Sequence, residues 1–204
     1  MLLGWNPGTE KEIYSLEEFI SAFSLERVHK TDLISFDREK LLWFNGVYIR
    51  QMSVEDLWLQ IVKWAARYGV DLGIDDRDHD YITKVVAITQ ERLRLFSEFN
   101  ELTSYFFTEP KVDKELLNKQ AGSADQVSEI LDGFKEVLSK IDNWNHESID
   151  KACHEFIEQK GYKNKEAFMT LRVAVTGSTM TPPVANVLEV LGSEKVLNRI
   201  SQAR

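Results

Sequence analysis

The stretch from Ser53 to Gly69, SVEDLWLQIVKWAARYG, decides the fold class of this 204-residue chain. Serine is favoured at the start of a helix because its hydroxyl accepts a hydrogen bond from a free backbone N–H of the first turn. Glycine often ends a helix, since it adopts left-handed backbone angles without a steric penalty. The apolar positions between them are Val54, Leu57, Trp58, Ile61, Val62 and Ala65. Spacings of three and four recur among these positions, which predicts an amphipathic helix with one buried face.

The same helix signals recur along the chain. Ser15 and Glu18 have the spacing of a capping box, and Asp37 can cap the next helix. A long helix is expected to follow the acidic segment Asp75–Asp80 and to continue to Leu95. Further helices are predicted over 124–141, 146–160, 165–175 and from 184 to the C-terminus. No segment shows the alternation of β-branched residues that marks a sheet, so the sequence predicts an all-α fold.

The composition indicates a folded, soluble protein, with 43% hydrophobic and 28% charged residues. No apolar run approaches the ~20 residues of a membrane span, and the N-terminus lacks a signal-peptide pattern. We therefore expect a cytoplasmic protein without membrane contact. The net charge of −8 argues against a generally basic nucleic-acid binder. A local basic face stays possible, because residues 161–204 hold six Lys and Arg against three Glu, although an ordinary solvated surface explains this excess equally well.

Cysteine and histidine usage gives no support to a disulfide or a metal site. Cys153 is the only cysteine, which excludes an internal disulfide, and we expect it to be a buried apolar residue. The four histidines are His29, His79, His146 and His154. They are scattered without the spacing of metal ligands, so none is assigned a metal or catalytic role.

The acidic segment Asp75–Asp80 invites a calcium-loop interpretation. The loop of an EF-hand needs a Gly at its sixth position and a Glu at its twelfth. Counted from Asp75, these positions are Asp80 and Val86, so the interpretation is rejected. With no phosphate-binding loop or nucleophile triad either, no catalytic residue, metal ligand or cofactor site is assigned.

Short strings along the whole chain carry a resemblance to a known family. They are Leu2–Trp5, Phe23–Val28, Phe36–Asp37, Lys40–Leu41, Trp43–Gly46, Tyr48–Arg50, Gln90–Arg92, Tyr105–Phe107, Leu171–Gly177, Pro182–Pro183, Leu191–Gly192 and Arg199–Ile200. In order and spacing these strings resemble bacterial glutamyl-tRNA synthetases, specifically the C-terminal region that follows the catalytic domain. The segment between Glu109 and Asn145 matches no string of that family.

The resemblance implies a division of the chain into three helical parts. Residues 1–75 resemble the stem-contact region, and residues 76–142 and 143–204 resemble the two subdomains of an anticodon-binding cage. A module boundary is expected between residues 105 and 145. The full-length family uses ATP and Mg, but the motifs that bind them are not in this sequence, so no cofactor and no catalysis are expected of the chain alone.

The partner implied by the resemblance is tRNA(Glu), with tRNA(Gln) as a second partner of non-discriminating enzymes, bound by a monomer. An all-helical acidic chain also fits a protein–protein scaffold that does not bind RNA, and this alternative stays open.

Two candidate tRNA contacts lie on the predicted helix that follows Asp37. Lys40 and Trp43 are three residues apart and share a helix face, where a cation and an aromatic ring can meet RNA backbone and ribose. Ordinary surface packing explains the pair equally well. Trp58, in contrast, is expected to be a core residue.

The segment Gly177–Val184 is a second candidate, since the resemblance implies that it faces the anticodon. Thr181, Pro182 and Val184 are expected to contact the first anticodon bases, with Arg172 donating to a base edge or a phosphate. The alternative is that these residues form a helix cap and that Arg172 is a surface residue.

Arg92 matches the arginine that reads the third anticodon base in the family. The alternative is that Arg92 pairs with Glu91 or Glu98 on its own surface.

Overall fold

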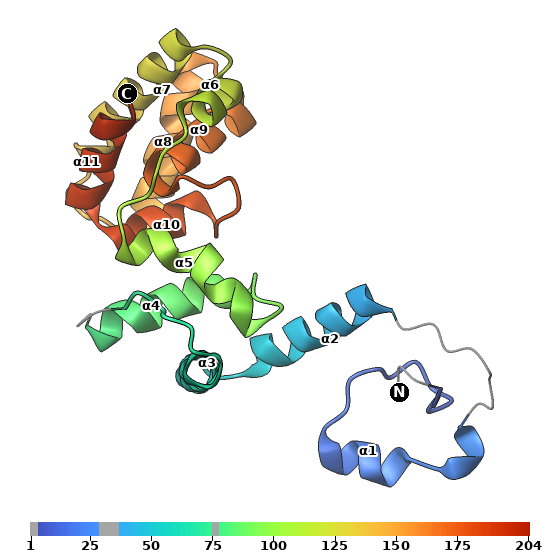
Figure 1. Ribbon diagram of the computed structural model, residues 1–204. Helices are drawn as coiled ribbons and strands as arrows, with labels where there is room; N and C mark the ends of the chain where they lie inside the picture. The colour runs from blue at the N-terminus through green and yellow to red at the C-terminus, as the bar shows by residue number, and fades with distance from the viewer. Residues whose placement is uncertain (1–3, 29–36, 75–77) are drawn as a thin grey trace.

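The computed structural model describes residues 4–28, 37–74 and 78–204, and all regular secondary structure in these ranges is helical. The predicted all-α fold is confirmed (Figure 1). The helices are α1 (Leu16–Ala22), η1 (Leu25–Arg27), α2 (Arg38–Gln51), α3 (Val54–Tyr68), α4 (His79–Gln90), η2 (Phe96–Glu98), α5 (Phe99–Phe107), α6 (Lys114–Ala121), α7 (Ala124–Leu138), α8 (His146–Lys160), α9 (Asn164–Thr176), α10 (Val184–Leu191) and α11 (Ser193–Ala203).

Some of the sequence predictions fall on residues outside these ranges. They concern Leu2 and Leu3, His29, Phe36, and the start of the acidic segment at Asp75 and Asp76.

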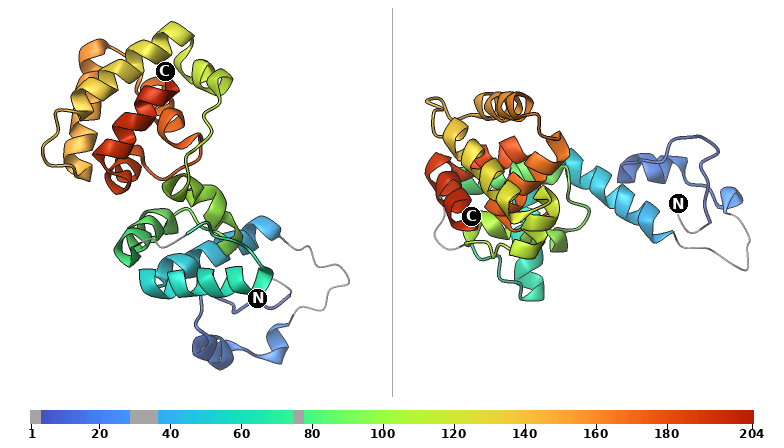
Figure 2. Two further views of the ribbon diagram at one scale, coloured as in Figure 1. Left: turned by 60° about the vertical axis from the view of Figure 1, so that its left-hand side comes forward. Right: turned by 90° about the horizontal axis from the view of Figure 1, so that it is seen from above.

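The N-terminal section, residues 4–28, is held together by aromatic packing. The ring of Trp5 lies edge-on to Phe19, with 5.3 Å between centroids, and stacks on Phe23 at 5.9 Å. This section touches the rest of the chain through α2, where the hydroxyl of Tyr48 donates to the backbone carbonyl of Tyr14 at 2.9 Å. Figure 2 shows α2 reaching from the other helices toward this section.

Helix α3 forms as its sequence predicts. The Ser53 hydroxyl accepts a hydrogen bond from the Asp56 N–H, and Gly69 ends the helix in the left-handed conformation, with φ 64°. Leu57 and Ile61 on the apolar stripe are fully buried, and the helix packs against α4. Local sequence signals were sufficient here because each cap is made within one turn.

Helix α4 ends at Gln90, so the predicted continuation to Leu95 is wrong. The Gln90 side-chain amide donates to the carbonyls of Ile49 and Met52, both at 2.9 Å, which anchors the helix end on α2. The Glu98 carboxylate then accepts from the backbone N–H groups of residues 94 and 95, at 2.8 and 3.0 Å. These N–H groups are satisfied without a helix, and the chain turns into η2.

The C-terminal bundle comprises α6 to α11. Helix α8 has the predicted bounds and ends at Gly161, whereas α7 stops at Leu138, before the predicted end at residue 141. The predicted last helix is two helices, because Gly192 between them has φ 82° and ψ 154°, which no helix contains. Helix α6, which the pattern did not predict, is capped by the Asp113 carboxylate and packs on α9.

The predicted boundaries after residues 75 and 142 lie between helices that pack together, α3 with α4 and α7 with α8. The helices before the segment 108–113 pack mainly on one another, and those after it form the C-terminal bundle. This segment, between α5 and α6, is within the range predicted for a module boundary. Helix α10 packs on α4, and one continuous core joins residues on both sides of this segment. The groove described below lies beside it.

Gly133 in α7 makes possible a close contact with α8. A Cβ added at this position would lie 2.2 Å from two ring carbons of Phe156, a buried side chain that also packs on Phe134. Alanine ordinarily stabilises a helix interior by about 1 kcal/mol relative to glycine. Here the overlap with a buried ring costs more, typically about 1–3 kcal/mol for overpacking.

We therefore expect Gly133→Ala to lower the free energy of unfolding by at least about 1 kcal/mol, measured by urea denaturation. In a Phe156→Leu background the same substitution should cost less, since the ring edge is gone. An increase in stability on Gly133→Ala would show that the two helices can move apart freely.

Candidate nucleic-acid interface

Two hollows lie along α5 and meet at Glu101. The first, of about 500 Å³, is lined by Arg92, Arg94, Glu98, Glu101, Leu102 and Met180. The second, of about 470 Å³, is lined by Glu101, Ser104, Tyr105, Thr108, Glu109, Pro110, Lys111, Thr176, Gly177 and Ser178. We call them together the α5 groove. One wall comes from the turn after α4, and the other comes from the loop that follows α9.

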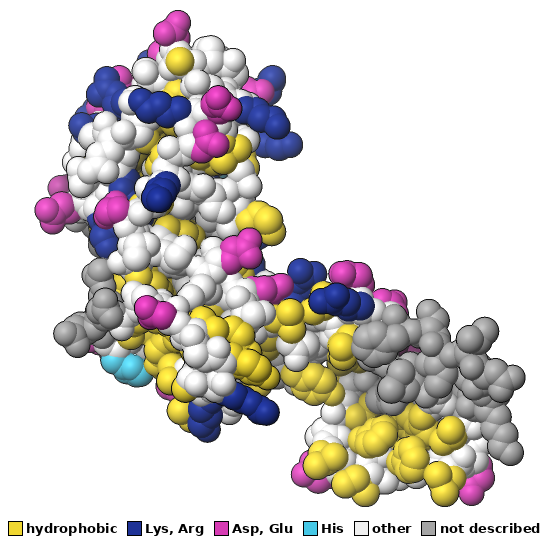
Figure 3. All heavy atoms as spheres, viewed as in Figure 1, with side chains coloured by type: hydrophobic (Ala, Val, Ile, Leu, Met, Phe, Trp, Pro, Cys, Tyr) yellow, Lys and Arg dark blue, Asp and Glu magenta, His cyan; other side chains and the backbone are white. Residues whose placement is uncertain are grey.

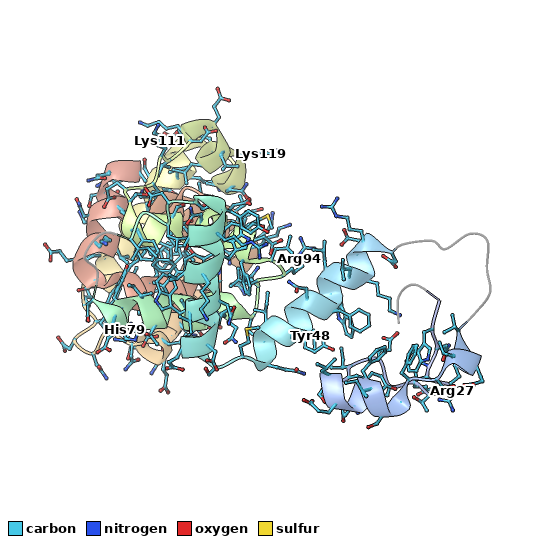
Figure 4. All side chains as sticks on the ribbon, turned by 60° about the horizontal axis from the view of Figure 1, so that its bottom comes forward. Arg27, Tyr48, His79, Arg94, Lys111 and Lys119 are labelled. Carbon is cyan, nitrogen blue, oxygen red and sulfur yellow. The ribbon has the colours of Figure 1, made fainter. Side chains whose placement is uncertain are left out.

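Arg92 lies in the exposed turn after α4 and lines the first hollow. The two carboxylates that the sequence offered as its partners face other arginines. Glu98 pairs with Arg94 at 3.3 Å, and Glu91 lies 4.0 Å from Arg50. Arg94 lies beside α2 (Figure 4). Within the described ranges Arg92 has no ion pair, so its guanidinium is available to a ligand.

Arg172 on α9 is half-buried and weakly held. Its Nη1 donates to the carbonyl of Thr179 at 3.3 Å and contacts the sulfur of Met169 at 3.4 Å, and no carboxylate of the described chain pairs with it. Burial lowers the pKa of the Arg172 guanidinium below its ordinary value, and the positive charge of Arg92 lowers it further. The two like charges thus act on each other, and neither forms an ion pair within the described ranges, an arrangement that favours an anion or a hydrogen-bond acceptor.

The loop after α9 buries the side chains of three of the predicted contact residues. Thr181 is fully buried, and its hydroxyl donates to the carbonyl of Pro182 at 2.9 Å. Pro182 and Val184 are also buried, so in this structure none of these three side chains is presented to a ligand. Met180 is 66% exposed and lines the first hollow. Sequence reasoning missed it, although a long apolar side chain in a loop before two prolines has no helix face to cover.

Lys40 and Trp43 lie on α2, and neither of them lines the α5 groove. The Lys40 ammonium pairs with Glu12 of the N-terminal section and lies 5.8 Å from the Phe44 ring centroid. Trp43 is 49% exposed and meets the same ring edge-on at 5.1 Å. Figure 3 shows basic and acidic side chains side by side over α2. If these two residues contact RNA, they do so at a separate place.

The basic excess of residues 161–204 does not form one face. Arg199 is buried and bonded to Glu109, Lys163 pairs with Glu166, and Arg204 pairs with Asp132. Arg172 differs from these three cations, since it has no carboxylate partner in the described ranges and bonds to the loop after α9 at Thr179.

Other sequence predictions concern residues away from the groove. Cys153 is buried, and burial raises the pKa of its thiol to about 12, which makes it unreactive. Trp58 packs on the core with its ring centroid 5.9 Å from that of Phe99, as predicted. The described ranges contain no cluster of His, Cys, Asp and Glu that could hold a metal ion. No helix within them is long and apolar enough to cross a membrane.

Comparisons with known proteins agree with this geometry. The family model described as "Anticodon binding domain" matches residues 55–204. A glutamate–tRNA ligase of Herpetosiphon aurantiacus is 36% identical over 204 residues, which are 99% of this chain and 41% of the relative. The glutamate–tRNA ligase of Bacillus pumilus is 32% identical over 202 residues, 98% of this chain and 41% of the relative.

The fold is also similar to a solved structure. The crystal structure of a glutamate tRNA ligase from Elizabethkingia meningosepticum superposes with a TM-score of 0.78 and 29% identity, covering 99% of this chain and 39% of that one. This chain thus spans about two fifths of the length of the relatives it matches. The match over residues 55–204 and these relatives confirm the resemblance seen in the sequence: the chain belongs to the anticodon binding domain family, in the form found in glutamate–tRNA ligases.

Proposed function

We propose that this chain binds tRNA(Glu) as a monomer and reads its anticodon along the α5 groove. Arg92 takes the third anticodon base, and Arg172 with the loop 177–184 takes the first two. The substrate is inferred from the name of the relatives, glutamate–tRNA ligase. We assign ATP-dependent glutamylation to residues that this chain does not contain. The cytoplasm is the compartment in which such a function operates.

The observation that carries the proposal is the placement of two guanidiniums that have no carboxylate partner in the described ranges: Arg92 lines the first hollow with Met180, and Arg172 bonds to Thr179, the residue before Met180. Arg94, the other arginine of the first hollow, is paired with Glu98 and Glu39 and so differs from these two guanidiniums. Unpaired bases of an RNA loop present acceptors on their Watson–Crick edges, and guanidiniums both donate to these edges and stack on the bases. The exposed side chain of Met180 offers an apolar surface in the same hollow.

The competing function is that of a helical scaffold without RNA binding. Titration of the 204-residue chain with tRNA(Glu), and with a tRNA of unrelated anticodon, separates the two functions. We expect tighter binding of tRNA(Glu), weakening as salt rises. Equal and negligible binding of both tRNAs would favour the scaffold.

Arg172→Ala should weaken the affinity for tRNA(Glu) about tenfold at low salt, since a satisfied base contact is worth ~1–3 kcal/mol in direct readout. The thermal midpoint should stay close to that of the wild type, because the side chain makes only long contacts with Thr179 and Met169. Lys163→Ala is the matched control, as it removes an exposed cation whose carboxylate partner is Glu166. Equal affinities of the Arg172 variant and the wild type would remove Arg172 from the interface.

A further inference from the structure

Two buried polar atoms in the α5 groove region have no hydrogen-bond partner. They are the hydroxyl oxygen of Tyr105 on α5 and the Nε of Arg172 on α9, and within the described part of the chain no other buried side-chain nitrogen or oxygen shares this property. Tyr105 is only 2% exposed. Unpaired buried polar groups are rare in folded proteins, because such a group loses its hydrogen bonds to water and gains none within the protein. Each one in a native structure therefore calls for an explanation, and a functional role is one of the known explanations.

The two groups lie at the same loop: Tyr105 lines the second hollow with Ser178, and Arg172 bonds to the carbonyl of the next residue, Thr179. Burial raises the pKa of the Tyr105 hydroxyl far above its ordinary value, while the charges of Arg172 and then Arg92 act in the opposite direction. The phenol is therefore protonated throughout the physiological range. A neutral hydroxyl oxygen can accept a hydrogen bond from a guanidinium N–H, and Nε–H is such a donor.

The Arg172 guanidinium is held only by weak contacts in this structure. Its bond to the Thr179 carbonyl is long, at 3.3 Å, and its other contact is a thioether sulfur, which is a weak acceptor. The charge of Arg92 nearby adds repulsion. A ligand that neutralises this repulsion would allow the guanidinium to settle in a different orientation.

We propose that Tyr105 is a positioning residue for Arg172. When RNA enters the α5 groove, the Arg172 Nε–H donates to the Tyr105 hydroxyl oxygen, which pairs both unpartnered atoms. The plane of the guanidinium is then fixed, and its terminal N–H groups are directed at an acceptor oxygen of the RNA. This inference rests on the proposed function, because it takes Arg172 as the residue that meets the RNA.

The test is Tyr105→Phe, which removes one oxygen and keeps the ring. We expect the affinity for tRNA(Glu) to fall about three- to tenfold, the effect of one net hydrogen bond. The thermal midpoint of the free chain should be no lower than that of the wild type, because the hydroxyl has no partner to lose there. Fluorescence anisotropy and thermal unfolding measure the two quantities.

Tyr81→Phe is the matched control from the same aromatic region. The Tyr81 hydroxyl donates to the carbonyl of Phe106 at 3.1 Å, so this substitution should lower the thermal midpoint and leave tRNA affinity unchanged. The second control is the double variant. Since Tyr105 is proposed to act through Arg172, Tyr105→Phe should cause no further loss of affinity when Arg172 is already alanine.

Three outcomes would overturn the inference. Unchanged affinity of the Tyr105→Phe chain excludes a role in binding, and a lowered thermal midpoint with unchanged affinity assigns the hydroxyl to the structure of the free chain. An equal loss of affinity in the Arg172→Ala background shows that Tyr105 acts independently of Arg172. Failure of the wild-type chain to bind tRNA(Glu) refutes the proposed function itself and is recognised before any variant is made.

Discussion

Replacing Arg92 with glutamine should reduce the preference for tRNA(Glu) over tRNA(Gln) about ten- to hundredfold, the worth of one specific base contact. The two tRNAs differ at the third anticodon base, which is C for glutamate and G for glutamine. On its Watson–Crick edge an unpaired cytosine presents two adjacent acceptors, N3 and O2, whereas guanine presents the donors N1–H and N2–H₂ and a single acceptor, O6. A guanidinium has donors only, so we expect Arg92 to favour the two adjacent acceptors of C over G, while a glutamine side chain offers both a donor and an acceptor.

The structure makes this substitution informative because Arg92 is exposed and has no ion pair in the described ranges. Arg94→Gln is the matched control: it removes an arginine from the same hollow, but one tied to Glu98 and Glu39. We expect this control to change the affinities for both tRNAs equally. Both tRNAs are titrated against the wild type and each variant. Equal losses for the two tRNAs on Arg92→Gln, or no loss, would refute base reading by this residue.

Arg199→Ala should lower the free energy of unfolding by about 3–5 kcal/mol, because two backbone carbonyls lose hydrogen bonds to a charged donor, worth about 1.5–3 kcal/mol each. Arg199 on α11 is only 2% exposed. Its guanidinium donates to the carbonyl of Val175 at 3.0 Å, to the carbonyl of Thr108 at 3.2 Å and to Glu109 at 3.1 Å. The two carbonyls belong to the C-terminal ends of α9 and α5, where a cation also interacts favourably with the helix dipole. One side chain thus joins three helices at the segment between α5 and α6.

The contribution of the carbonyls can be separated from that of the ion pair. Glu109 is largely exposed, and an exposed ion pair contributes only about 0–1 kcal/mol, so Glu109→Gln should cost far less than Arg199→Ala. Urea denaturation of the two variants measures the difference. If both substitutions lowered stability equally, the ion pair with Glu109 would be the dominant interaction, and capping of the two helix ends would contribute little.

Local signals in the sequence were enough for much of the fold. The capping box of Ser15, the cap at Ser53 and the glycine at 161 predicted α1, α3 and the end of α8, because every group involved lies within one helical turn of its partner. The family strings identified the family over nearly the whole chain, including the segment with Arg92.

Contacts between residues distant in the sequence decided the rest. The end of α4 depends on Gln90 reaching carbonyls 41 and 38 residues away, and the burial of Arg199 depends on carbonyls 24 and 91 residues away. Hydrophobic periodicity contains no information on such distant contacts. From the sequence alone, Arg199 is therefore indistinguishable from a surface cation. The placement of Arg92, Tyr105 and Arg172 has the same origin, because it depends on α4, α5 and α9 sharing one core. Side-chain charge and burial there are properties of the packed helices rather than of any one segment.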